Sequence, residues 1–156
     1  MRERTRRLIL IWHFFTSTKG GCSVVDQLIR QVLAGKRFAL LGFEAHDAES
    51  IIAALATVRC LGHIVGATTN NPGLNSFSPF DACFVNASAA RVDEQPSPAE
   101  MIARSHKPAV IIGTLEELFA RLETVTDPNR DFVMRPCGPD ELLLRAYCVL
   151  RFVGTL

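Results

Sequence analysis

Residues 80–86 read Phe-Asp-Ala-Cys-Phe-Val-Asn, and this stretch decides the fold of the chain. The four apolar residues 82–85 stand between a polar residue on entry and another on exit, which predicts a strand buried on both faces. In open parallel sheets, ligands gather at the carboxyl ends of such strands. A functional side chain is therefore expected at Asn86.

Short apolar runs on either side of this stretch alternate with segments of helical pattern. Alternation of this kind predicts a parallel sheet covered by helices on both faces. The predicted fold is α/β, a doubly wound five-stranded parallel sheet of flavodoxin-like type. The predicted strands are 38–41, 63–67, 80–86, 108–112 and 131–134, and the predicted helices are 48–61, one beginning at Ser97-Pro98, 114–124 and one from Pro139 onward.

The connection after the second predicted strand differs from the others. Residues 68–79 contain Asn-Asn-Pro-Gly and two serines, a composition that predicts turns. A connection between parallel strands normally needs a crossover helix. The second crossover helix is therefore predicted to be short or missing.

The chain before the sheet is predicted to have two parts. Residues 1–22 show no clean periodicity, and their polar, glycine-containing end predicts a poorly ordered tail. Residues 23–35 predict a helix with Ser23 as its N-cap and Gly35 at its end. The predicted domain follows at 36–156, and this first helix either packs on the domain or pairs with a partner.

The composition indicates one globular domain without a charge excess. The 156 residues are 48% hydrophobic, and 17 Lys and Arg residues nearly balance 16 Asp and Glu residues. Nucleic acid is therefore not expected as a partner. The five cysteines, an odd number at irregular spacings, indicate free thiols in a reducing compartment, so a cytoplasmic location is expected.

The N-terminal segment raises the alternative of export. An Arg-rich start followed by the apolar run Leu8–Phe15 loosely imitates a signal peptide. The run is shorter than the roughly 20 residues that span a bilayer, and no small-x-small cleavage site follows it. Membrane insertion is therefore not expected.

Four segments at predicted strand ends share a pattern with a known family. They are Gly-Lys-Arg-Phe-Ala-Leu-Leu (35–41), Phe-Asp-Ala-Cys-Phe-Val (80–85), Pro-Ala-Val-Ile-Ile (108–112), and Asp-Phe-Val-Met-Arg-Pro (131–136) with Pro-Asp-Glu-Leu (139–142). Over about residues 35–152 the chain resembles the receiver domains of two-component response regulators. The resemblance implies a receiver fold and a place in phosphorelay signalling.

The chain departs from that family at the positions that carry its chemistry. In working receivers, two adjacent acids after the first strand hold magnesium and an aspartate after the third strand accepts a phosphoryl group. A Ser or Thr follows the fourth strand, and a Lys precedes proline after the fifth. The corresponding positions hold Gly42 and Phe43, Asn86, Gly113 and Arg135, and with their neighbours Glu44 and Thr114 they form the degenerate phosphorylation site that the resemblance implies.

Each departure removes a chemical step. A carboxylate attacks phosphorus because it is anionic, whereas the neutral carboxamide of Asn86 is a poor nucleophile and cannot form an acyl phosphate. Magnesium prefers several oxygen ligands, and Glu44 is the local acid left to supply one. Asp47 is interpreted as a helix cap. The four histidines, His46 in the first loop among them, lack metal-type spacings with cysteine, so no metal, cofactor or catalytic residue is expected.

Arg135 keeps a positive charge where the family has lysine. Its planar guanidinium suits a carboxylate, so pairing with Glu44 or a bond to Asn86 is expected to lock the former phosphorylation site. A solvent-facing Arg135 is the alternative. Gly113 offers no hydroxyl, and Thr114 is interpreted as the start of a capping box with Glu117.

Two further features lie outside this site. Cys137 follows Arg135-Pro136, and because nearby positive charge can lower a thiol pKa, a redox-sensing thiol is an alternative to an inert cysteine. The final helix is apolar on almost all sides, which predicts that it is covered. Its candidate interface residues are Leu143, Tyr147 and Leu150, and either a partner or the first helix of the same chain is expected to cover them.

The sequence therefore predicts a degenerate receiver domain that is not an enzyme and acts through contacts with another signalling protein or with a second copy of itself. The alternative is a flavodoxin-like domain that binds a small ligand or a nucleotide at the same strand ends. It would use the polar loop Thr68–Asn75 and the amides that follow Asn86.

Overall fold

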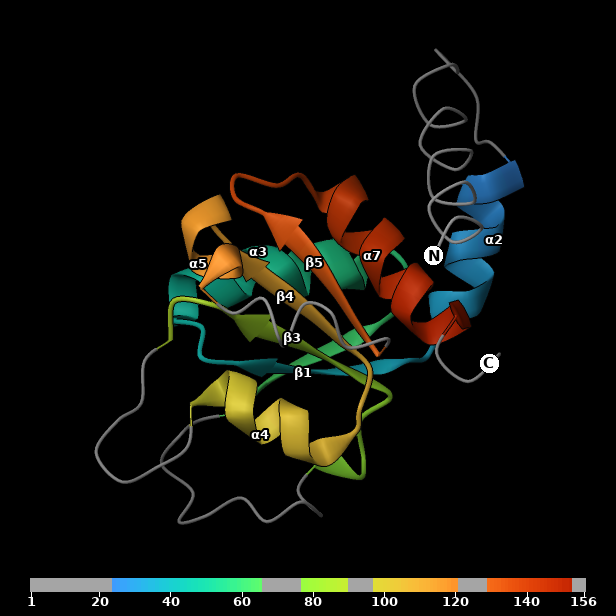
Figure 1. Cartoon of the computed structure of the whole chain (residues 1–156). Coiled ribbons are helices and arrows are strands. Elements are labelled where there is room, and N and C mark those ends of the chain that lie inside the picture. The colour runs from blue at the N-terminus through green and yellow to red at the C-terminus, as the bar shows by residue number, and fades with distance from the viewer. Residues whose placement is uncertain (1–23, 66–76, 90–96, 121–128, 153–156) are drawn as a thin grey trace.

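The computed structural model describes residues 24–65, 77–89, 97–120 and 129–152. At its centre is a five-stranded sheet of order β2-β1-β3-β4-β5, in which every neighbouring pair is parallel (Figure 1). This confirms the predicted α/β class and flavodoxin-like topology. The strands are β1 Arg37–Leu41, β2 Leu61–Val65, β3 Ala82–Asn86, β4 Ala109–Gly113 and β5 Arg130–Met134, and the helices are α2 Val24–Leu33, α3 Ala45–Ala56, α4 Pro98–Ser105, α5 Leu115–Phe119 and α7 Pro139–Phe152.

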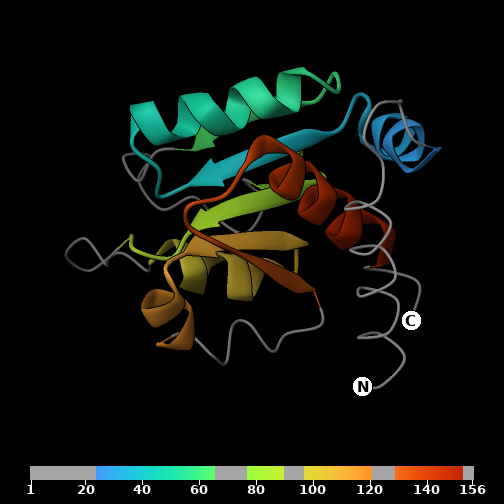
Figure 2. The ribbon, with the colours of Figure 1, turned by 90° about the horizontal axis from the view of Figure 1, so that it is seen from above.

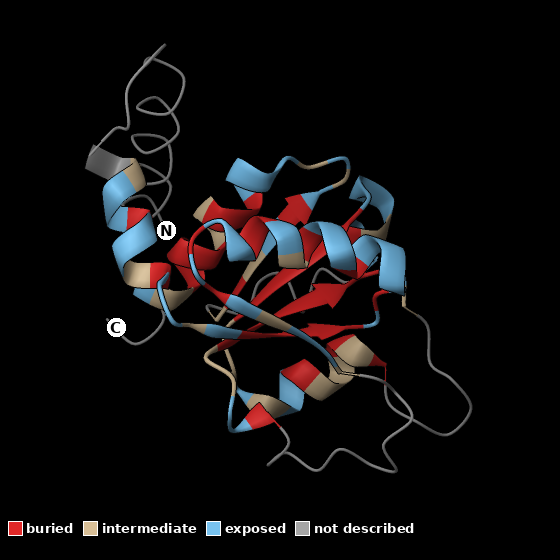
Figure 3. Ribbon diagram, turned by 180° about the vertical axis from the view of Figure 1, so that it is seen from behind, coloured by how far each residue is buried: buried red, intermediate tan, exposed pale blue. Residues whose placement is uncertain are grey.

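Strand β3 is buried along its whole length, as the sequence predicts (Figure 3). It begins at Ala82, two residues later than expected. The Asp81 carboxylate accepts a hydrogen bond from the backbone N–H of Arg37 at 2.8 Å and lies 3.7 Å from Lys36 Nζ. Asp81 therefore ties together the amino ends of β1 and β3, at the sheet edge opposite to Asn86.

Successive residues of each strand point to opposite faces of the sheet, and they pack into two separate hydrophobic cores, one on each face. Phe38 and Phe84 lie on the face that α3 and α7 cover, whereas Val85 and Ile111 lie on the face of α4 and α5. Figure 2 shows the two layers of helices on either side of the sheet. Because the strands run in one direction, their carboxyl ends lie together at one end of the sheet. The candidate functional residues lie at this end.

Helix α3 lies earlier in the chain than the predicted 48–61. Glu44 occupies its N-cap position without a side-chain capping bond, and Asp47 lies in the first turn. The prediction that Asp47 caps the helix is therefore wrong. The helix ends at Ala56 because Arg59 adopts a positive φ of 61° and turns the chain into β2, which begins two residues before the predicted 63–67.

The two capping predictions on the other face are confirmed. Ser97 caps α4 with Pro98 at the first helical position, and Glu100 completes a capping box that the sequence analysis did not identify. Thr114 and Glu117 form the predicted capping box at the start of α5. Helix α5 is described only to Phe119, and the rest of the predicted helix 114–124 lies largely outside the described residues.

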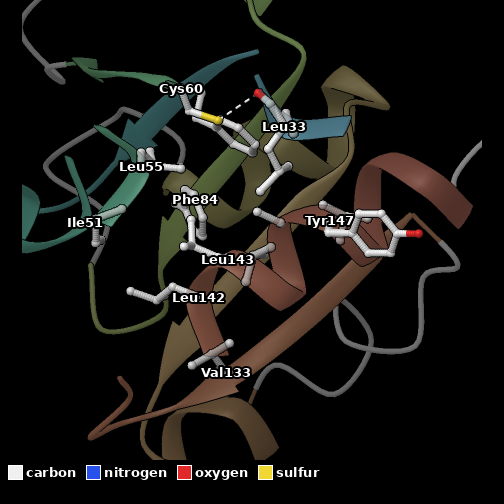
Figure 4. Packing of buried hydrophobic residues seen from close by; sticks show 14 of the residues in the cluster. Leu33, Ile51, Leu55, Cys60, Phe84, Val133, Leu142, Leu143 and Tyr147 are labelled. Carbon is white, nitrogen blue, oxygen red and sulfur yellow. Dashed lines mark hydrogen bonds between the residues drawn. The ribbon is translucent and has the colours of Figure 1, made fainter. Parts of the chain in front are cut away.

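Helix α2 packs against α7 (Figures 1 and 4). Its buried residues Ile29 and Leu33 belong to the same cluster as Leu143 and Tyr147. The Leu33 carbonyl also accepts a hydrogen bond from Cys60 Sγ, drawn in Figure 4. The first helix of the chain thus covers apolar surface of its last helix.

Several predictions lie outside the described residues. They concern the tail at 1–22, the capping role of Ser23 and most of the second crossover at 68–79. Within the described part of the chain, none of the helices has the length and apolar character needed to span a bilayer.

Candidate functional site

Asn86 lies buried at the carboxyl end of β3, and its side-chain amide is held at both ends. Nδ2 donates to the carbonyl oxygen of Gly42 at 2.8 Å, in the loop after β1. Oδ1 accepts from Arg135 Nη2 at 2.6 Å and from the Ser88 hydroxyl and backbone N–H at 2.7 and 3.1 Å. The carboxamide therefore joins the ends of three strands.

Arg135 takes one of its two predicted partners. It follows β5 and is joined to Pro136 by a cis peptide bond, and its guanidinium bonds the Asn86 carboxamide. Among the described residues, no hydrogen bond or ion pair joins Arg135 to Glu44, which is exposed at the N-cap of α3. A fixed positive charge thus lies against the position that carries the phosphoryl acceptor in working receivers.

Neither of the two positions after β1 is placed to carry a metal-binding acid. Gly42 has a positive φ of 74°, and a Cβ on it would lie 2.5 Å from Ala89 Cβ and 2.9 Å from Pro98 Cγ. Phe43 is buried in the core beneath α3 and α7. Glycine is required at 42 by both its backbone and its neighbours, and Phe43 contributes packing where a metal ligand would need to face solvent.

The position after β4 is closed in the same way. A Cβ on Gly113 would lie 2.7 Å from Ala87 Cβ and 3.0 Å from Glu117 Oε2. The adjacent hydroxyl of Thr114 accepts from the Glu117 backbone N–H in the capping box. Gly113 therefore has no hydroxyl, and the hydroxyl oxygen of Thr114 is held at the N-cap of α5.

The backbone amides after Asn86 are used within the chain. Each of the three N–H groups of residues 87–89 donates internally. Their acceptors are the Ile112 carbonyl for Ala87, the Asn86 side chain for Ser88 and the Asn86 carbonyl for Ala89. These amides do not offer an anion site, and the loop Thr68–Asn75 of the ligand-binding alternative lies mostly outside the described residues.

The described ranges bring together no three His, Cys, Asp or Glu side chains that could hold a metal ion. Glu44, His46 and Asp47 are all exposed in the loop and first turn after β1. Magnesium coordination needs several oxygen ligands converging on one point, and Asn86 is already occupied by Gly42 and Arg135. The arrangement does not suit the metal that phosphoryl transfer to a receiver requires.

The thiol of Cys137 does not fit the redox alternative. Burial raises its pKa above the ordinary value, Glu141 raises it further, and Arg135 only partly offsets both effects. A reactive thiolate needs the opposite shift. The sequence identified the correct neighbouring arginine, but not the burial that outweighs it.

The candidate interface residues on α7 face their own chain. Leu143 and Tyr147 are each 8% exposed, and Leu150 is half-buried against the same cluster. Figure 4 shows Leu143 and Tyr147 beside Leu33. Helix α2 is thus the cover that the apolar α7 requires.

Ser88 is the contact of the site that the sequence analysis did not identify. Its spacing from Asn86, two residues on, is the spacing of an Asx turn, so a local signal was present. The packing of Ala89 and Pro98 over Gly42 had no comparable signal, because it joins residues far apart in the chain.

The fold is shared with receiver domains of known structure, although the sequence matches no protein-family model and no curated protein. A response regulator receiver protein from Sinorhizobium medicae superposes with a TM-score of 0.58 at 17% identity, over 76% of this chain and 96% of that one. A putative response regulator from Chloroflexus aurantiacus gives 0.59 at 13% identity, over 74% and 98%.

A longer protein of known structure shows the same likeness over part of its length. A structure described as belonging to redox sensors in the streptococci that evolved from two-component response regulators gives a TM-score of 0.61 at 17% identity. The match covers 75% of this chain and 52% of that one, so this chain spans about half of its length. The predicted resemblance to receiver domains is confirmed at the level of the fold.

Proposed function

We propose that this chain is a degenerate receiver domain of a two-component phosphorelay that does not take up phosphate at the usual position and acts through protein contacts. The partner is another signalling protein or a second copy of the chain. The proposal assigns it no catalytic activity and places it in the cytoplasm.

The observation that carries this proposal is the state of Asn86. A phosphoryl acceptor must be an anionic nucleophile with an open side. The Asn86 side chain is neutral, buried, and bonded on one side to the Gly42 carbonyl and on the other to Arg135 and Ser88. The Asn86 side chain therefore lacks both the negative charge and the open approach that nucleophilic attack on phosphorus requires.

The residues around Asn86 also differ from those of a working receiver, so more than one substitution separates this site from a phosphorylatable one. Restoring an acid at 42 brings its Cβ against Ala89 and Pro98, and restoring a hydroxyl at 113 brings a Cβ against Ala87. Repacking of these neighbours is the expected consequence of a chain no longer required to bind metal and phosphate. In this proposal the receiver fold is retained because it presents surfaces that bind other proteins.

Incubation of the full chain with acetyl phosphate and magnesium tests the proposal. Intact mass measurement is expected to show no added phosphate on the wild type, and none on Asn86→Asp, because position 42 and Phe43 still lack the metal-binding carboxylates. A working receiver domain treated in parallel is the positive control. An acid-stable, base-labile phosphate on the wild-type chain overturns the proposal.

The contact role needs a separate measurement. Capture of the tagged chain from its native cell, with histidine kinases and output domains sought among the bound proteins, identifies a signalling partner. Sedimentation of the purified chain measures self-association. A monomer that captures no signalling protein contradicts the contact role and leaves the chemistry of Asn86 untouched.

A further inference from the structure

Ser88 combines an exposed position with a direct link to the candidate functional site. It is the first exposed residue after the buried strand β3. Its hydroxyl donates to Asn86 Oδ1 at 2.7 Å, and its backbone N–H donates to the same oxygen at 3.1 Å. The N–H already forms the Asx turn, so the hydroxyl adds a second bond to a turn that exists without it.

The charged group bonded beside this hydroxyl is the guanidinium of Arg135. Arg135 Nη2 donates to the same Oδ1 at 2.6 Å, so the Ser88 oxygen lies within roughly 5 Å of Nη2. A guanidinium has five N–H donors. The described residues give Arg135 no other hydrogen bond and no ion pair. Arg135 thus carries a fixed charge and unused donors beside an exposed hydroxyl.

The other residues that close this corner are uncharged. Asn86 also bonds the Gly42 carbonyl, and Ala89 and Pro98 lie over Gly42. An anion attached to Ser88 therefore meets the positive charge of the arginine and no negative charge among these residues. A phosphate suits the arrangement, because its oxygens accept paired, charge-assisted hydrogen bonds from the planar guanidinium of arginine.

We propose that Ser88 is phosphorylated by a serine kinase and that Arg135 binds the resulting phosphate. The Ser88 oxygen attacks the γ-phosphorus of a nucleoside triphosphate, the bond from that phosphorus to the β-phosphate oxygen breaks, and a nucleoside diphosphate leaves. The hydroxyl proton passes to a base of the kinase. Because the kinase supplies both the base and the magnesium, the chain itself needs no metal ligand and no carboxylate nucleophile.

Phosphorylation changes the bonds at Asn86. The modified Ser88 oxygen has no proton to donate to Oδ1, and the phosphate is a stronger acceptor for Arg135 than the neutral amide. Arg135 is therefore expected to leave Asn86 for the phosphate, at an exposed position that a partner protein reaches. This inference goes beyond the proposed function, on which it rests only in assuming that a partner responds to the change.

The contact with Arg135 is measured on the full chain with phosphoserine incorporated genetically at position 88. The second ionisation of a phosphoserine has a pKa of about 6, and the charge of Arg135 is expected to lower it by about one pH unit. Phosphorus NMR during a pH titration measures this pKa. Arg135→Ala in the same phosphorylated chain is expected to restore the ordinary value, and circular dichroism checks that the variant keeps its fold.

Ser50 provides the matched control. It is exposed on α3, next to the acidic Glu49, and no hydrogen bond joins it to an arginine in the described part of the chain. Phosphoserine at position 50 is expected to titrate at the ordinary pKa or above it, with no response to Arg135→Ala. Equal pKa values at 88 and 50, or a pKa at 88 that stays low in Arg135→Ala, overturn the proposed phosphate contact.

Mapping of phosphopeptides from the chain purified from its native cell tests whether the modification occurs. Phosphate is expected on Ser88 and is expected to survive hydroxylamine, which cleaves an acyl phosphate but leaves phosphoserine intact. A chain without phosphate on Ser88, in both growing and resting cells, overturns the proposal. Acetyl phosphate without a kinase does not load a serine hydroxyl, so the phosphodonor experiment on Asn86 is decided independently.

Discussion

At the scale of single residues, one hydrogen-bonded amide decides the character of the site. Asn86 presents a donor to a carbonyl and an acceptor to a guanidinium, and only an amide satisfies both. A carboxylate at this position would face the Gly42 carbonyl with oxygen against oxygen. The amide of Asn86 therefore supplies a bond across the strand ends that a carboxylate would not make.

Replacement of Arg135 tests this bond. Arg135→Ala is expected to lower the free energy of unfolding by about 1–2 kcal/mol, because it leaves a buried amide oxygen without its charged donor. Urea denaturation measures the change. Arg104→Ala, on the exposed side of α4, is the matched control and is expected to stay within about 0.5 kcal/mol of wild type. An Arg135→Ala protein as stable as the control excludes a locking role for this arginine.

Gly42 and Gly35 form a natural pair for measuring closure of the site. Both have positive φ, 74° and 77°, but a Cβ on Gly35 meets nothing within 4 Å. Gly35→Ala should therefore cost only the backbone strain, about 1 kcal/mol. Gly42→Ala adds the overlap with Ala89 and Pro98 and should cost roughly 2–4 kcal/mol. Equal losses in the two variants would mean that the loop after β3 moves away from Gly42 at little cost.

At the scale of elements, α2 behaves as part of the core. Leu33 is 0% exposed and shares a cluster with α7, and its carbonyl accepts from Cys60. Arg30 donates to the Thr57 carbonyl at 3.0 Å, which ties the helix to the end of α3. The surface of α7 that an outside partner would need is therefore taken by the chain itself.

Truncation of two leucines on the same helix tests that role. Leu33→Ala is expected to lower the free energy of unfolding by about 2–4 kcal/mol, because it opens a cavity between α2 and α7. Leu28→Ala, at a position 46% exposed, is expected to change it by less than about 0.5 kcal/mol. Denaturant melts of both proteins measure the difference. Similar small effects would show that α2 is only loosely attached.

At the scale of the whole molecule, three buried thiols are expected to lower the stability of the folded protein at alkaline pH. Burial raises the pKa of Cys60 and Cys148 from 9.0 to about 11 and that of Cys83 to about 12. The pKa of each thiol is higher in the folded protein than in the unfolded chain. The stability that each protonated thiol contributes is therefore fully present below about pH 9, and it is lost as the pH rises through the folded-state pKa.

Stability is therefore expected to fall between about pH 9 and pH 12, under reducing conditions. Denaturant melts at intervals of pH measure the decline. Cys83→Ala is expected to be less stable near neutrality, because of its small cavity, but to lose less stability over that range. A decline as steep in Cys83→Ala as in the wild type would assign the alkaline effect to other groups.

The sequence by itself determined the parallel sheet, its order of elements, the capping box of α5 and the amide at the end of β3, because these depend on local patterns. Neighbouring residues in the sequence are enough to predict the burial of residues 82–85 and the capping pair of Thr114 and Glu117. They also place Asn86 at the end of its strand. Tertiary structure alone decided that Arg135 bonds Asn86 instead of Glu44, that Ala89 and Pro98 close over Gly42, and that α2 covers Tyr147. Those contacts join distant parts of the chain, so their energies depend on distances and burial that no local pattern encodes.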